Sequence, residues 1–216
     1  MVGLSFPVTL SNITVVVHAS HLGTPLDCGD SSNYAFFAHW KHAPPLTVYF
    51  KSDIPSPLLL EVKLGRDAWD NEEHPAGALT SLLESDSADI VVTWGAIDGA
   101  GNTLAQTAST IENGIHVIHA VITFDSDESW GTGVALSCSS PTPVSVIDVS
   151  THEFGHALIA LGDRGDAALT MYGFYFAAGR TLAAGDKLGV ENQQWHSHGG
   201  GGGHLCIPAC PDDPSG

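Results

Sequence analysis

Basic side chains are scarce in this chain of 216 residues, in which seven Lys and Arg stand against 24 Asp and Glu, for a net charge of −17. Such an acidic surface repels phosphate backbones and anionic lipid headgroups, so we expect no nucleic-acid partner and no membrane partner. Long apolar runs are also lacking, because none approaches the roughly 20 residues that a membrane-spanning helix needs. We therefore expect a soluble protein.

Cysteine is sparse too, and its four residues are Cys28, Cys138, Cys206 and Cys210. An even number fits two disulfides in an exported protein, although the spacing leaves their pairing open. The first 20 residues lack the basic segment and the cleavage site of an ordinary signal peptide, so we expect an atypical or truncated start. Secretion is nevertheless the predicted localisation.

Hydrophobic residues make up 43% of the chain, which is enough for one sizeable core. We expect an N-terminal extension over residues 1–33, one folded domain over 34–195 and a flexible tail over 196–216. The tail is rich in Gly, His and Cys, and its five consecutive glycines at 199–203 favour flexibility over a metal site.

Hydrophobic periodicity and breaker residues predict a series of elements in the domain. Strands are expected at 46–50, 90–94 and 115–124, a helix at 56–70 and a short final helix near 182–193. A second long helix is expected between the last strand and the final helix. Strands followed by helices in this order indicate an α+β fold.

The pentapeptide His152-Glu153-Phe154-Gly155-His156 has the HExxH pattern. Residues four apart lie one above the other on a helix, so both imidazoles can bind one ion with the carboxylate of Glu153 beside it. Ser145, with Asp148 three residues later, predicts the start of this helix, and Gly162 predicts its end. The pattern is typical of zinc peptidases, in which three protein ligands leave one position for water.

Further motifs follow the pentapeptide, namely Leu161-Gly162-Asp163, Met171-Tyr172, Gly179-Arg180-Thr181-Leu182 and Asp186-Lys187-Leu188-Gly189-Val190. Together with Thr151 to Leu158 they resemble the matrixin-type metzincin peptidases, most strongly over residues 145–192. The resemblance implies a twisted, mostly parallel sheet, an active-site helix, a Met turn and a C-terminal helix within a catalytic domain at 34–195. It also implies that the strand at 90–94 forms the cleft rim that pairs with an extended substrate.

The resemblance assigns roles to five residues. His152, His156 and Asp163 would bind Zn²⁺, Glu153 would be the catalytic base, and Met171 would form the apolar floor beneath the ligands. The implied activity is that of a secreted, monomeric zinc endopeptidase acting on proteins or peptides. The alternative function is a non-catalytic binding protein that keeps the metzincin fold with a degenerate zinc site.

The alternative arises because this chain departs from the family pattern. Asp163 lies eleven residues after the first His of the motif, where ten is usual, and the family's glycine after the second His corresponds to Ile159 or Ala160. Asp166 is a weaker candidate for the third ligand. Glu191 would take that place if a glutamate from a later helix completed the site.

Two acidic turns predict a candidate Ca²⁺ site. They are Asp98-Gly99-Ala100-Gly101 and Asp125-Ser126-Asp127-Glu128. Asp98, Asp125 and Glu128 would supply the hard oxygen ligands that calcium prefers. The alternative is a solvated acidic surface.

Three more HxxH pairs occur, His18 with His21, His39 with His42 and His116 with His119. Side chains three residues apart on a strand point to opposite faces, so the two rings of a pair would not share an ion. We therefore interpret these six residues as packed or surface histidines.

Overall fold

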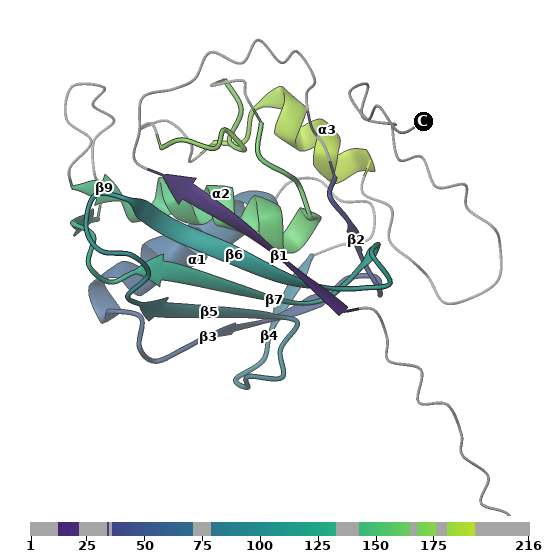
Figure 1. The fold of residues 1–216 in the computed structure, drawn as a ribbon, viewed down its shortest axis with the longest axis horizontal. Helices are drawn as coiled ribbons and strands as arrows, with labels where there is room; N and C mark the ends of the chain where they lie inside the picture. The colour runs from purple at the N-terminus through teal and green to yellow at the C-terminus, as the bar shows by residue number, and fades with distance from the viewer. Residues whose placement is uncertain are drawn as a thin grey trace, which may run out of the picture.

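The computed structural model describes residues 13–21, 34, 36–70, 79–132, 143–164, 168–175 and 181–192. The elements in chain order are β1 (Ile13–His21), β2 (His39–Trp40), β3 (Leu46–Phe50), α1 (Ser56–Asp70), β4 (Thr80–Leu82), β5 (Ile90–Gly95), β6 (Thr103–Glu112), β7 (His116–Asp125), β8 (Trp130–Gly131), β9 (Val144–Ser145), α2 (Val146–Ile159) and α3 (Ala184–Asn192). A mixed sheet with α2 packed beside it dominates the view in Figure 1, which confirms the α+β prediction.

The strands of the main sheet are ordered β1-β6-β7-β5-β3-β4, and β2 pairs with β7 as well. Parallel pairing joins β4 to β3, β3 to β5, β5 to β7 and β2 to β7. Only β6 pairs antiparallel with its neighbours, β7 on one side and β1 on the other. The sheet is therefore parallel over most of its width, as predicted, and antiparallel at the β1 end.

The predicted role of the 90–94 strand as the cleft rim is wrong. This segment belongs to β5, which pairs with β3 on one side and with β7 on the other. Its β7 side is paired from Ile90 to Gly95 and its β3 side from Ile90 to Val92, so neighbouring strands already occupy most of the backbone groups that a substrate would need. Strand β6, which is the neighbour of β1 in the sheet, lies against α2.

The sheet also begins earlier than the predicted domain boundary at residue 34. Strand β1 lies within the segment that we expected to be an N-terminal extension, and it pairs with β6 along its whole length. Its outermost position makes it an end strand of the sheet. The remainder of residues 1–33, the tail at 196–216 and all four cysteines lie outside the described residues.

Several predicted elements match the structure closely. The helix expected at 56–70 is α1, the strand expected at 46–50 is β3, and the final helix near 182–193 is α3. The long strand expected at 115–124 is β7, displaced by one residue. None of the helices in the described part of the chain has the length and apolarity to cross a membrane.

Helices α1 and α2 pack closely against each other through buried polar contacts. The Trp69 indole donates to the carbonyl of Thr151 at 2.7 Å, and the Ser150 hydroxyl donates to the carbonyl of Val62 at 2.7 Å. A Cβ on Gly65 would lie 2.3 Å from Ser150 Oγ and 2.7 Å from the Ser150 carbonyl carbon. The spacing of the two helices therefore requires glycine at position 65.

We predict that Gly65→Ala destabilises the protein by about 1–3 kcal/mol, because the added methyl must push the two helices apart. The free energy of unfolding, measured by urea denaturation, tests this. Gly95→Ala is the matched control, since a Cβ there meets no atom within 4 Å. Equal stabilities for the two variants would contradict the close packing of α1 on α2.

Candidate metal centre

Helix α2 carries the HExxH pentapeptide and begins where the sequence predicted. Ser145 is its N-cap, and the side chain of Ser145 accepts from the backbone N–H of Asp148. The predicted end at Gly162 is wrong, because the helix ends at Ile159 and Ala160 forms the C-cap in a left-handed conformation with φ of 56°. Glycine is the usual residue in this left-handed position, but here alanine adopts it. The chain therefore turns toward Asp163 at Ala160, before it reaches Gly162.

Backbone carbonyls fix the orientation of both imidazoles of the motif. His152 Nδ1 lies 2.8 Å from the carbonyl oxygen of Thr170, and His156 Nδ1 lies 2.6 Å from that of Leu161. A carbonyl only accepts, so each Nδ1 carries the hydrogen. The two Nε2 atoms face each other at 2.9 Å. Metal-binding histidines are commonly oriented in this way, by a hydrogen bond from the ring nitrogen that does not bind the metal.

Asp163 completes a set of three converging donor atoms. Its Oδ1 lies 3.3 Å from His152 Nε2 and 3.4 Å from His156 Nε2. Ligands bound tetrahedrally to zinc at 2.0–2.1 Å are separated by about 3.3 Å. The separations here are close to that value, so the structure brings the three predicted ligands together in a geometry that fits one zinc ion.

The charges of these side chains also suit a cation. Burial raises the pKa of Asp163, but hydrogen bonds from His152, His156 and His18 outweigh it and hold the pKa well below its usual range. Burial lowers the pKa of His152, yet its hydrogen bond to Asp163 and the nearby charge of Glu153 raise it to about 9. For His156, burial and the charge of His152 leave the pKa lowered. The cluster therefore favours an ionised Asp163 beside positive charge, which a divalent cation would supply.

The described structure does not test the other two candidates for the third ligand. Asp166 lies outside the described residues, and the side chain of Glu191, in α3, is not among the described ones. Asp163 is the carboxylate that the described structure places against both histidines of the motif.

Glu153 is fully buried, and a residue that the sequence did not single out holds it in place. The hydroxyl of Thr107, on β6, lies 2.6 Å from Glu153 Oε2. Thr107 is itself fully buried. One carboxylate oxygen of Glu153 is thereby oriented by the sheet, beside the two imidazoles of the same helix.

Met171 lies directly against the helix that carries the motif. A Cβ on Gly155 would come 2.1 Å from Met171 Sδ and 2.8 Å from Trp69 Cζ2, so glycine between the two histidines permits this approach. The backbone N–H groups of Thr170 and Met171 donate to the carboxylate of Asp186, on α3. Asp186 thus positions the segment whose Thr170 carbonyl orients His152, a role that the sequence analysis missed.

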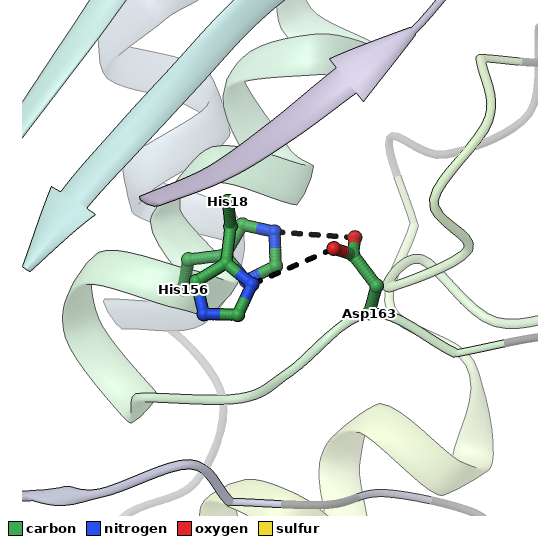
Figure 2. Close-up of side chains that lie close together, drawn as sticks. All are labelled: His18, His156 and Asp163. Carbon is green, nitrogen blue, oxygen red and sulfur yellow. Dashed lines mark ion pairs between the residues drawn. The ribbon is translucent and has the colours of Figure 1, made fainter. Parts of the chain in front are cut away.

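A third imidazole reaches the cluster from β1. His18 Nδ1 lies 3.5 Å from Asp163 Oδ2, and the His18 ring stacks on that of His156 with centroids 4.4 Å apart (Figure 2). The interpretation of His18 as an ordinary packed or surface residue missed this contact. The apolar sequence around His18 could have indicated a strand. The HxxH spacing, however, gave no indication that His18 would contact Asp163.

The acidic turns make contacts of a different kind from those of a cation site. Asp98 accepts from the N–H and the hydroxyl of Thr103, and Asp125 accepts from the N–H groups of Asp98 and Asp127. Glu128 Oε1 accepts from the N–H of Gly101 at 2.6 Å. Backbone donors thus hold these carboxylates, and the part of the chain with described coordinates shows no metal-ligand cluster at them. Calcium binding stays a prediction, and these contacts favour a role in fixing the turns.

We predict that Asp125→Ala and Glu128→Ala each lower stability by about 1–3 kcal/mol in calcium and in chelator alike, because each leaves backbone N–H donors without their acceptor. Melting temperatures under the two conditions test this, with the exposed Asp127→Ala as control. A calcium-dependent rise in the melting temperature of the wild type that disappears in both variants would restore the calcium interpretation.

Comparison with known proteins agrees with the geometry. A model of the matrixin family matches residues 79–193, which cover β4 to α3 and include the complete HExxH helix and Asp163. A comparison with curated proteins gave no match. The matched segment is more than half of the 216 residues, and the chain belongs to the matrixin family.

Proposed function

We propose that this protein is a zinc-dependent endopeptidase that hydrolyses protein or peptide substrates. Matrixins are generally zinc metalloproteases, so membership of the family supports the reaction class. The observation that carries the proposal is the convergence of His152, His156 and Asp163 at separations that suit tetrahedral zinc.

The donor set fits zinc in kind as well as in distance. Two imidazole nitrogens and one carboxylate oxygen are the ligand types of catalytic zinc sites, which keep one further position for water. Each imidazole is held by a backbone carbonyl through its other nitrogen. Zinc bound here would supply a water of pKa near 7 and polarise the substrate carbonyl.

Proton transfer falls to Glu153 in this proposal. Its carboxylate takes the proton from the attacking water and returns it to the departing amine nitrogen. The hydroxyl of Thr107 orients one oxygen of that carboxylate, so the base has a fixed direction relative to the two imidazoles. Met171 supports the helix from beneath, as a Met turn would, and takes no part in the chemistry.

The alternative of a non-catalytic binding protein loses its main support. It arose from the residue inserted before Asp163 and from the missing glycine. The left-handed cap at Ala160 accommodates both departures, since Asp163 still contacts the two histidines. We retain the predictions that the protein is secreted and acts as a monomer.

We predict that Glu153→Gln lowers peptide hydrolysis by roughly 10²–10⁴-fold while zinc stays near one ion per chain. The amide keeps the size of the side chain but cannot accept the proton. Casein hydrolysis and metal analysis of the same preparation measure the two quantities. A variant that keeps even a tenth of the wild-type rate would show that Glu153 is not the base.

We predict that Asp163→Ala weakens zinc binding by more than the 10–100-fold that is typical of losing an outer-shell partner, because it removes a ligand. Glu191→Ala is the comparison and should retain zinc. Metal content after dialysis against a chelator measures both. If Glu191→Ala is the variant that loses zinc, the ligand set belongs to the other zincin class.

A further inference from the structure

A buried hydrogen bond connects the sheet with the side chain that we propose as the base. The hydroxyl oxygen of Thr107, on β6, lies 2.6 Å from Oε2 of Glu153, on α2, and 3.2 Å from the backbone carbonyl oxygen of the same residue. Strand β6 lies against α2 (Figure 1), and neither Thr107 nor Glu153 has exposed surface. A hydrogen bond in such a place is strong because the effective dielectric constant is low.

The two distances indicate where the hydroxyl hydrogen points. Threonine has a single O–H donor, and an ionised carboxylate only accepts. The separation of 2.6 Å falls in the range of about 2.5–2.7 Å that is typical of a hydroxyl donating to a carboxylate. The carbonyl oxygen, at 3.2 Å, is the more distant second acceptor. The hydroxyl of Thr107 therefore donates to Oε2 of Glu153.

The donor is held by a strand that is paired on both sides. Thr107 lies opposite His18 of β1 on one side and opposite Ile122 of β7 on the other. A β-branched side chain also has few allowed conformations about its first torsion. The hydroxyl consequently has a fixed direction, and Glu153 takes its orientation from the sheet.

We infer that Thr107 is a positioning residue that divides the work between the two oxygens of Glu153, with Oε2 as the anchored atom and Oε1 as the atom that carries the proton. This inference rests on the proposed peptidase function. A proton on Oε2 would point at the hydroxyl hydrogen of Thr107. Uptake there would require the hydroxyl to turn toward the more distant carbonyl oxygen.

Both proton transfers then use the same atom. The attacking water gives a proton to Oε1 while its oxygen forms a bond to the peptide carbonyl carbon. The proton passes from Oε1 to the amine nitrogen as the C–N bond breaks, which regenerates the carboxylate of Glu153 and leaves a carboxylic acid and an amine. Because Thr107 keeps its bond to Oε2 throughout, the base need not reorient between the two steps. Such preorganisation lowers the barrier of the reaction without strengthening the binding of substrate.

Strand β6 supplies a matched control two residues further along. Ser109 projects from the same face as Thr107 and is also fully buried. Its hydroxyl, however, has no hydrogen-bond partner in the part of the chain that the structure describes. Ser109→Ala and Thr107→Val thus each remove a buried hydroxyl from one face of one strand, but only Thr107→Val removes a bond to Glu153.

The kinetics of four variants of the zinc-loaded full chain test the positioning role. Thr107→Val keeps the shape of the side chain and should lower kcat by roughly 10–100-fold, the effect of losing one hydrogen bond to a charged group. KM and zinc content should stay at the wild-type values, because neither substrate nor ion is bound by Thr107. Thr107→Ala should resemble Thr107→Val, whereas Thr107→Ser keeps the hydroxyl and should retain most of kcat. Ser109→Ala should match the wild type.

A double variant separates action through Glu153 from a general effect on the fold. If Thr107 acts by orienting the carboxylate, Thr107→Val should have little further effect on the residual hydrolysis by Glu153→Gln, since the base is already lost. A structural role would be felt in either background. Equal fold losses from Thr107→Val in the wild type and in Glu153→Gln would therefore overturn the inference.

The remaining outcomes distinguish this inference from the proposed function. An active wild type with an equally active Thr107→Val, or a loss in Ser109→Ala as large as that in Thr107→Val, would overturn the role of Thr107 alone. No hydrolysis by the zinc-loaded wild type would overturn the proposed peptidase and this inference with it. Circular dichroism of each variant shows that the rates are compared between folded proteins.

Discussion

Burial of α2 is the constraint on which the rest of the structure depends. Every residue of this helix except Ile147 is buried, including the two histidines and the glutamate of the motif. A polar group in such a place is costly unless it is hydrogen-bonded within the protein. The carbonyls of Thr170 and Leu161 and the hydroxyl of Thr107 supply those bonds. The same contacts that make burial tolerable also give the site its geometry, because they fix the direction of each ring and of the carboxylate.

The same burial explains why glycine stands at two positions of the helix pair. Gly65 lets α1 approach the backbone of Ser150, and Gly155 lets Met171 and Trp69 approach between the two histidines. Met171 in turn belongs to the segment that Asp186 holds through two backbone N–H groups. A side chain on α3 therefore controls the carbonyl that orients His152. The site thus depends on α1, α3 and β6 as much as on the helix that carries the motif.

Local patterns in the sequence were sufficient to predict those elements whose structure depends on a single segment of the chain. The spacing of His152, Glu153 and His156 gave the helical part of the site, and apolar periodicity gave α1, β3 and β7. Strand β6 was missed because its inward positions include Thr107 and Ser109, which are fully buried although polar. A hydrophobicity pattern cannot distinguish such a strand from a loop. The rim was assigned to the 90–94 strand through the family resemblance, and the error shows that the order of strands depends on pairing between distant segments, which the sequence does not display.

The position of His18 is the extreme case of this limit, because it depends on the register between β1 and β6 and on the turn at Ala160 that brings Asp163 back. Among the side chains described from Ile13 to His18, only Val16 and His18 are partly buried. Backbone pairing with β6 and the contacts of these two side chains therefore hold β1 beside the site, and no local pattern in the sequence connects this strand with the helix that carries the motif.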